Sequence, residues 1–159
     1  MELVQQNVDS GHKMLGFSQF TSLLAILKRE LSNNELPYEY LDGATLDRQK
    51  HVDNFNNDPS LPLFLLSLKA GGTGLNLVSA DTVLIYDPWW NPAAELQAAD
   101  RAHRIGQTKA VNICKLVVRD SIEEKILALQ GRKKAVFDAL ITDTVPDKLT
   151  AAELRSLIL

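Results

Sequence analysis

The stretch that says most about this chain is residues 63–74, Leu-Phe-Leu-Leu-Ser-Leu-Lys-Ala-Gly-Gly-Thr-Gly. Its first six residues are almost wholly apolar, which is typical of a central strand buried on both faces of a parallel sheet. The glycines that follow can bring backbone amides close to an anion. The loop lacks the Gly-Lys-Ser/Thr of a Walker A loop and the third glycine of a dinucleotide fingerprint. A tight turn from strand to helix is therefore as good an interpretation as a ligand site.

Apolar strands and helical periodicities alternate on either side of this stretch. Further short strands are expected at residues 13–17, 38–41, 82–86 and 111–118. Helices are expected at residues 2–9, 18–31, 45–55, 92–105, 121–140 and 150–159. Ser18 and Thr45 are expected to cap two of them. The alternation over the first 120 residues predicts an α/β fold, an open and mostly parallel sheet with helices on both faces.

Polar residues follow the carboxyl ends of the expected strands, the edge at which such sheets bind their ligands. They are Ser18 and Gln19 after the first strand, Asp42, Gly43 and Thr45 after the second, Lys69 to Asn76 after the third, and Asp87 to Asn91 after the fourth. This clustering indicates function, although any α/β fold has polar loops at both edges of its sheet.

The composition of the 159 residues excludes several classes of protein. One cysteine, Cys114, excludes an internal disulfide framework and a cysteine-based zinc cluster, and it is expected to be a buried structural thiol. The three histidines lie far apart, without metal-ligand spacing. No apolar run is long enough for a membrane span, and the N-terminus carries no signal-peptide core. These features favour a reducing, cytoplasmic compartment.

The charge of the chain is unevenly distributed. Its formal net charge is −3, yet residues 101–134 hold nine Lys or Arg against three Asp or Glu. A basic segment in an acidic protein suggests an anionic partner such as phosphate or a nucleic-acid backbone. For the run Arg132 to Lys134 alone, a solvated helix face is the preferred interpretation.

Residues 97–107, Gln-Ala-Ala-Asp-Arg-Ala-His-Arg-Ile-Gly-Gln, carry a stronger signal. On a helix, Gln97, Arg101 and Arg104 share one face, and Asp100 can orient an arginine. Two arginines near strand ends can clamp a polyphosphate, whereas the structural alternative is a surface ion pair of Asp100 with Arg104. Of the adjacent tryptophans Trp89 and Trp90 in the loop before this segment, one is expected in the core and the other is a candidate for stacking on a base or entering a groove.

Five stretches in this order together resemble the second half of the SWI/SNF-type ATPase motor, within the superfamily 2 helicases. They are Gly16–Phe20, Leu41–Thr45, Ser67–Leu77, Asp81–Pro92 and Gln97–Gln107. The resemblance covers residues 11–159, and the double tryptophan and the C-terminal tail resemble bacterial members most. Gly16 departs from the pattern, because members carry a bulky aliphatic residue there, and looser packing is expected.

The resemblance implies a RecA-like lobe over residues 1–141, including a brace helix, followed by a linker and a short helix over residues 142–159. In such motors ATP and Mg²⁺ lie in a cleft between two lobes and are held mainly by the N-terminal ATPase lobe. That lobe supplies the Walker A loop and an Asp-Glu pair, neither of which occurs in this sequence. We therefore expect this chain alone to be inactive and to act as part of an ATP-dependent double-stranded DNA translocase.

The resemblance also implies roles for individual residues. Arg101 and Arg104 would reach the γ-phosphate, with Arg104 as the arginine finger and Gln97 positioning both. Gly74, Asn76 and Asp100 would bind the nucleotide or couple it to DNA. The residues expected to face DNA are Ser18, Gln19, Gly43, Thr45, Lys69 and Trp90.

The implied partners are duplex DNA, the first lobe and a nucleoprotein such as RNA polymerase. The implied location is the cytoplasm or, for a bacterial protein, the nucleoid. The alternative is a stand-alone nucleotide- or nucleic-acid-binding module.

Overall fold

A computed structural model describes residues 1–71, 74–87, 100–102, 107, 109–121, 124 and 131. The chain divides into two compact units, Met1–Leu116 and Val117–Leu159, and every helix and strand named below belongs to the first. The predicted boundary at residue 141 and the helix predicted at 150–159 lie outside the described residues, as do most of the helices predicted at 92–105 and 121–140.

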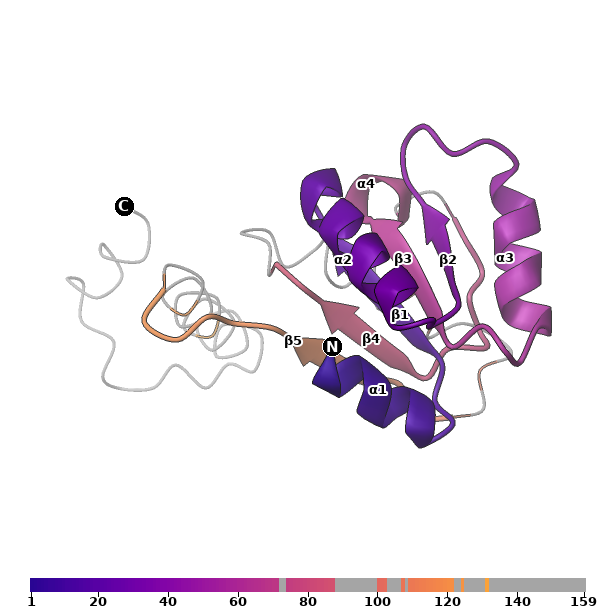
Figure 1. The fold of residues 1–159 in the computed structure, drawn as a ribbon. Coiled ribbons are helices and arrows are strands. Elements are labelled where there is room, and N and C mark those ends of the chain that lie inside the picture. The colour runs from indigo at the N-terminus through magenta and orange to yellow at the C-terminus, as the bar shows by residue number, and fades with distance from the viewer. Residues whose placement is uncertain are drawn as a thin grey trace, which may run out of the picture. The chain divides into compact units, whose positions relative to one another are not determined.

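Five strands form one sheet in which every neighbouring pair is parallel, so the predicted fold class is confirmed (Figure 1). The strand order is β2-β3-β1-β4-β5. The strands are β1 Met14–Ser18, β2 Tyr38–Leu41, β3 Leu63–Ser67, β4 Thr82–Ile85 and β5 Asn112–Lys115. The helices are α1 Glu2–Asp9, α2 Thr21–Asn33, α3 Arg48–Asn57 and the single turn α4 Leu68–Gly71.

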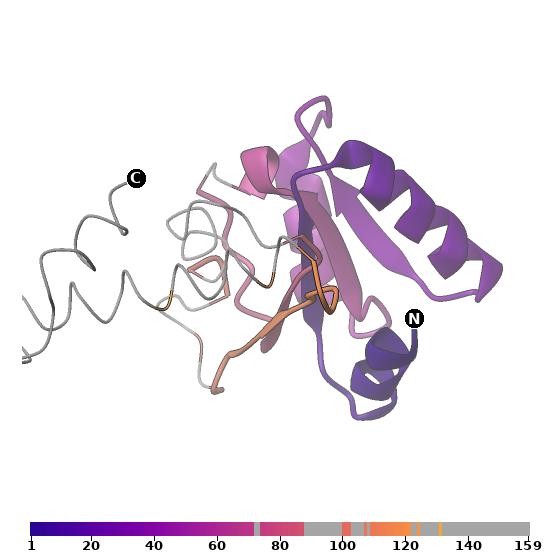
Figure 2. The same cartoon turned by 90° about the vertical axis from the view of Figure 1, so that its left-hand side faces the viewer.

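The two faces of the sheet carry separate apolar clusters, because side chains alternate along each strand. One face packs Phe17, Phe64 and Leu66 against Val52 and Phe55 of α3. The other packs Met14, Leu63 and Leu65 with residues of α1 and α2, namely Val4, Leu24 and Leu31. Figures 1 and 2 show α1 and α2 together on one side of the sheet. None of the described helices is long and apolar enough to span a membrane.

Both predicted N-caps are wrong. Helix α2 is preceded by Phe20, without a side-chain capping bond, and the Ser18 hydroxyl accepts a 3.0 Å hydrogen bond from the Phe20 amide. Helix α3 follows Asp47, whose φ of 50° is left-handed. The Thr45 hydroxyl bonds to Asp42 instead. Ser and Thr hydroxyls bond to nearby backbone in turns as readily as at helix starts, and the turns prevail at both positions.

Gly16 does not loosen the packing, contrary to expectation. The ring of Tyr86 and the side chain of Leu65 occupy the space beside it, and a Cβ built at Gly16 would lie 2.9 Å from Leu65 Cδ2 and 3.0 Å from Tyr86 Cε2. The bulk missing at position 16 is therefore supplied from the end of β4. Burial raises the pKa of Tyr86 to about 12.

Strand β5 is shorter and more exposed than the predicted apolar strand at 111–118. Three of its four residues are exposed, because β5 lies at the edge of the sheet. Cys114 is only partly buried and, like Tyr86, packs against the cluster that includes Leu84. A partly buried thiol in an edge strand still gives no sign of a nucleophile, since no histidine is hydrogen-bonded to it in the part of the chain that the structure describes.

Candidate nucleotide and nucleic-acid interface

The parallel register brings the carboxyl ends of β1 to β4 to one edge of the sheet. Ser18 pairs with Ser67, Phe17 with Ile85, and Leu41 with Leu66. The polar residues that follow these strands are therefore neighbours in space, as the sequence predicted for a parallel sheet. Figure 1 shows α4 and the loop after β2 at this edge.

The ends of β1 and β4 are joined by two hydrogen bonds. The backbone amide of Gln19 donates to Asp87 Oδ2 at 2.9 Å, and the amide of Tyr86 donates to the Phe17 carbonyl at 3.0 Å. Ser18 is fully buried and its hydroxyl is used within the turn. Of the two residues predicted to face DNA here, only Gln19 is partly exposed.

The turn after β2 is organised around the carboxylate of Asp42. Oδ2 accepts a 2.8 Å hydrogen bond from the Tyr40 hydroxyl, and Oδ1 accepts bonds from the Ala44 amide and the Thr45 hydroxyl. The hydrogen bond from Tyr40 is the largest cause of a lowered pKa of Asp42, to which Ala44 and Thr45 add. Burial first, then the bond to Asp42, raises the pKa of Tyr40 to about 12. The turn is thus held rigidly with Gly43 exposed.

Helix α4 presents Lys69 beside this turn along the same edge. The Ser67 hydroxyl accepts a hydrogen bond from the Ala70 amide at 3.2 Å and so fixes the first turn after β3. Lys69 is exposed, whereas Ala70 is buried in the core. An exposed cation on a fixed turn at the carboxyl edge of the sheet can contact a phosphate without sequence preference.

The loop of residues 74–80 alternates between exposed and buried side chains at its start. Gly74 and Asn76 are exposed, while Leu75 and Leu77 are buried. Gly74 has a φ of 64°, in the left-handed region that favours glycine. The two predicted nucleotide-coupling residues therefore lie on the outer side of a loop whose apolar residues anchor it to the core.

Arg101 lies directly against this loop. The amide of Leu77 donates to the Arg101 carbonyl at 3.1 Å, and Ala102 is fully buried in the same cluster as Leu77. The structure also buries Arg101 to 6% relative exposure, while Asp100 is exposed. The structure therefore brings Arg101 to the loop that carries Gly74 and Asn76. Gln97, Arg104 and Trp90 lie outside the described residues.

Two residues that sequence reasoning did not single out hold this loop in place. Asn56, at the end of α3, donates to the Asn76 carbonyl, and Gln107 donates to the carbonyls of Val78 and Ala80. Gln107 is the last residue of the 97–107 stretch, and its place in that stretch was the only feature of the sequence that indicated a role for it. Asn56 gave none, because a polar residue at a helix end looks like any solvated residue.

The opposite edge of the sheet carries an ionic cluster around Asp81, whose side chain is 3% exposed. His12 Nδ1 and Lys109 Nζ lie 2.9 Å and 3.1 Å from its Oδ2. Burial pushes the pKa of Asp81 upward, but the hydrogen bonds from His12 and Lys109 outweigh it and keep the pKa below its usual range. The cluster joins the end of α1 to the segments leading into β4 and β5, which is a structural role.

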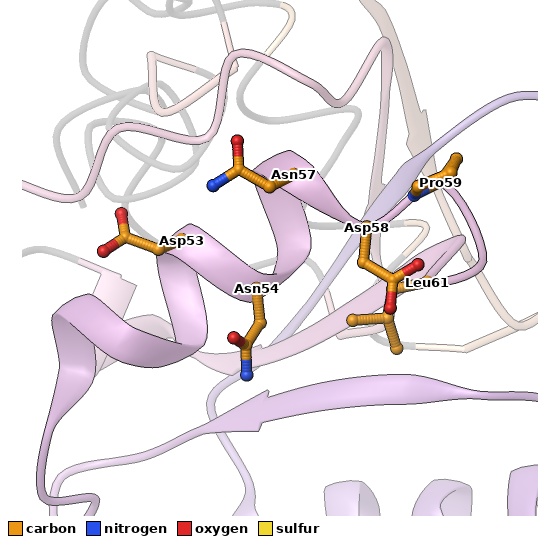
Figure 3. Close-up of a pocket in the computed structure, with 6 residues that line it drawn as sticks. All are labelled: Asp53, Asn54, Asn57, Asp58, Pro59 and Leu61. Carbon is orange, nitrogen blue, oxygen red and sulfur yellow. The ribbon is translucent and has the colours of Figure 1, made fainter.

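A shallow pocket lies along the last turns of α3 and the loop that follows (Figure 3). Its residues are Asp53, Asn54, Asn57, Asp58, Pro59 and Leu61. In Figure 3, Asp53 and Asn57 point away from Asn54 and Asp58, so the polar groups do not converge on one point. Among the described residues, no three His, Cys, Asp or Glu are grouped as a metal site requires.

Comparison with known proteins shows which family shares this arrangement. Residues 1–106 match the family described as helicase conserved C-terminal domain. The chain is 49% identical over 138 residues to the ATP-dependent helicase FUN30 of Saccharomyces cerevisiae, covering 86% of this chain and 12% of that protein. It is 45% identical over 133 residues to the human lymphoid-specific helicase, covering 82% of this chain and 16% of that protein.

Two further matches extend this result. The protein CHROMATIN REMODELING 19 of Arabidopsis thaliana is 44% identical over 169 residues, covering 99% of this chain and 22% of that protein. The crystal structure of the C-terminal part of the Fun30 ATPase domain superposes with a TM-score of 0.77 at 50% identity, covering 80% of this chain and 42% of that one. The chain thus spans less than a quarter of the full length of the yeast, human and Arabidopsis proteins. They are eukaryotic, so the expected bacterial source has no support here, and none of their names mentions RNA polymerase.

Proposed function

Because this chain belongs to the helicase conserved C-terminal domain family, as found in SWI/SNF-type ATPases, we propose that it is the second lobe of an ATP-driven double-stranded DNA translocase. Its relatives are named as ATP-dependent helicases and chromatin remodellers. Their RecA-like fold is shared by the sheet described above. In this proposal the lobe contributes residues to ATP bound on a first lobe and grips duplex DNA, as part of a motor that moves nucleoprotein.

The observation that carries the proposal is the contact between the 74–80 loop and the segment with Arg101. The Leu77–Arg101 hydrogen bond joins the two segments for which the family resemblance implies nucleotide contacts. This backbone hydrogen bond keeps Arg101 close to the exposed residues Gly74 and Asn76. Such an arrangement suits a lobe that meets a nucleotide held elsewhere.

On the ATP side, Arg101 and Arg104 act on the γ-phosphate when the two lobes close. Their guanidinium groups gain phosphate partners only in the closed state, and hydrolysis removes that gain, so the lobes reopen. Gln97 positions the arginines, and Asp100 orients one of them. ATP and Mg²⁺ are held mainly by the first lobe, and bound Mg²⁺ neutralises charge that develops on the phosphates.

On the DNA side, the edge formed by the exposed Gly43 and Lys69 and the partly buried Thr45 meets the phosphate backbone, with Gln19 at the same edge. The turn after β2 supports this role, because both carboxylate oxygens of Asp42 accept hydrogen bonds within the turn and hold it rigid. Trp90 reaches toward a groove. Since these contacts are to phosphates, the lobe binds duplexes without sequence preference.

The proposal is tested by measuring ATP hydrolysis with and without duplex DNA, for the purified 159-residue chain and for the full motor in which it is joined to its first lobe. The chain alone is expected to be inactive, because its sequence contains no Walker A loop and no Asp-Glu pair. The full motor is expected to hydrolyse ATP faster when DNA is added. Turnover by the chain alone, or a full motor that is indifferent to DNA, would contradict the proposal and favour a separate binding module.

A further inference from the structure

Three carbonyl oxygens in the 74–80 loop receive hydrogen bonds from side-chain amides of distant segments. Asn56 Nδ2 donates to the Asn76 carbonyl at 2.9 Å. Gln107 Nε2 donates to the Val78 carbonyl at 3.0 Å and the Ala80 carbonyl at 2.7 Å. The two amides thus hold alternate carbonyls along one loop, Asn56 from helix α3 and Gln107 from the segment before β5.

The acceptor oxygen of each amide is used as well. Asn56 Oδ1 accepts a hydrogen bond from the Ser79 amide at 3.4 Å, and Gln107 Oε1 accepts one from the Lys109 amide at 2.9 Å. Gln107 Nε2 also lies 3.4 Å from the Ala102 carbonyl, one residue beyond Arg101. Gln107 donates to two loop carbonyls and accepts one amide at a single side-chain end, a combination that only a carboxamide offers.

Helix α3 continues this connection toward the turn after β2. At its start, the Arg48 guanidinium donates to the Gly43 carbonyl at 3.4 Å. Along its length, Val52 and Phe55 are buried in the core, at 2% and 0% relative exposure. A short helix that is packed this closely moves as one body rather than bending. Its last turn holds Asn56, which grips the loop.

We propose that Asn56 and Gln107, named here the amide clamp, are positioning residues that transmit movement between the turn at residues 42–45 and the segment carrying Arg101. When the turn and Lys69 engage DNA, α3 shifts the 74–80 loop through Asn56, and Gln107 passes that shift to residues 100–102. This inference rests on the proposed function, in which the turn meets DNA and Arg101 meets ATP. It adds the physical link by which DNA raises the rate of hydrolysis.

The first experiment measures steady-state ATP hydrolysis by the full motor at saturating duplex DNA. Asn56→Ala and Gln107→Ala are each expected to lower kcat by about 2- to 30-fold, the size of effect typical for residues along a coupling network. The KM for ATP and the Kd for DNA should stay near the wild-type values, because neither residue contacts a ligand. The double variant should be little worse than the more severe single variant, since both residues act through one loop.

Matched controls come from the same helix. Asn54→Ala removes a side-chain amide two residues from Asn56 that bonds to Glu39 instead of the loop. Gln49→Ala removes an amide that bonds to Asp53 on the helix surface. Both controls should keep the wild-type kcat. A wild-type kcat in both clamp variants would overturn the inference. A lowered kcat that is accompanied by a comparable loss of DNA affinity, or by a lower melting temperature, would overturn it as well.

A second experiment examines the clamp in the 159-residue chain by amide hydrogen exchange. The Leu77 amide, which donates to the Arg101 carbonyl, should exchange faster in both clamp variants than in the wild type and both controls. Unchanged exchange would overturn the clamp whatever the kinetics show. A wild-type full motor without DNA-stimulated turnover would instead reject the proposed function and the transmission that rests on it, while exchange alone would still decide whether the clamp exists.

Discussion

At the scale of single residues, the carboxylate of Asp42 is the group whose ionisation matters most for the turn after β2, because that turn is built on its hydrogen bonds. Its pKa is lowered, first by the hydrogen bond from Tyr40. A carboxyl group with a lowered native pKa contributes stability above its unfolded pKa of about 4, and that stability is lost as the pH falls through the native pKa. The turn is therefore sensitive to acid below about pH 4 and insensitive near neutrality.

Replacing Tyr40 with Phe tests this dependence. The variant should raise the pKa of Asp42 toward its usual value, because it removes the largest cause of the shift. Its unfolding free energy should be lower than wild type at pH 7 and should fall less between pH 5 and pH 2. NMR titration of the Asp42 carboxyl and urea unfolding at several pH values measure both effects. Ser32→Ala, which removes only the 3.5 Å contact of Ser32 with the Tyr38 hydroxyl, is the control.

Arg104→Ala in the full motor tests the arginine-finger proposal. ATP turnover should fall by about 10³- to 10⁵-fold while ATP and DNA binding persist, because the guanidinium stabilises the transition state rather than the ground state. Arg104→Lys should restore little of the lost turnover, since lysine lacks the planar, forked guanidinium group of arginine. Arg101→Ala should also be severe, and the double variant little worse than either single one.

The alternative for these arginines is an ion pair with Asp100 that only holds the segment together. It predicts a lower melting temperature, and it predicts that Asp100→Ala behaves like Arg104→Ala. Melting curves are therefore recorded beside the rates. A well-folded Arg104→Ala motor with near-normal turnover would end the arginine-finger proposal.

Lys69→Ala tests the proposed DNA edge. Affinity should fall by a similar factor on every duplex, and the slope of log K against log salt should decrease by about one, because one phosphate contact is lost. Lys50→Ala, an exposed lysine on α3 outside the proposed DNA edge, is the matched control. An unchanged salt slope for Lys69→Ala, or a loss confined to one sequence, would contradict a phosphate contact.

At the scale of elements, the pairing of β1 with β4 depends on the space beside Gly16. Gly16→Ala should destabilise the fold by about 1–3 kcal/mol, because the new Cβ would lie within 3.0 Å of Leu65 and Tyr86 side-chain atoms. Shortening Tyr86 in the same chain, as Gly16→Ala/Tyr86→Leu, should recover part of this loss. Urea unfolding of the two singles and the double measures the coupling.

Gly43→Ala is the control for this prediction. A Cβ at Gly43 meets no atom within 4 Å, so its effect on stability should stay within about 0.5 kcal/mol. Additive effects of the Gly16 and Tyr86 substitutions would show that the tyrosine ring does not supply the bulk missing at position 16.

At the scale of the whole molecule, much of the architecture was readable from the sequence. The five strands and the parallel α/β class were predicted correctly, with β2 Tyr38–Leu41 matching its expected bounds. This succeeded because strand composition and helical period are local properties, recorded in neighbouring residues. The clustering of polar residues at one edge followed from the same class, since parallel strands end together.

The tertiary structure alone decided which segments touch. Gln19 and Asp87 are 68 residues apart, Asn56 and Asn76 are 20 apart, and Gln107 and Ala80 are 27 apart. No periodicity in the sequence reveals such pairs, because a hydrogen bond between distant segments leaves no pattern in either one.

The same limit explains Gly16, which looked like a packing defect in the sequence, whereas the structure places the ring of Tyr86 beside it. Ser18 and Thr45 were wrongly predicted as helix caps, because their hydroxyls can hydrogen-bond either to the helix start or to a nearby turn, and they bond within the turn. Sequence determined the elements, whose causes are local, and only folding decided the contacts between them.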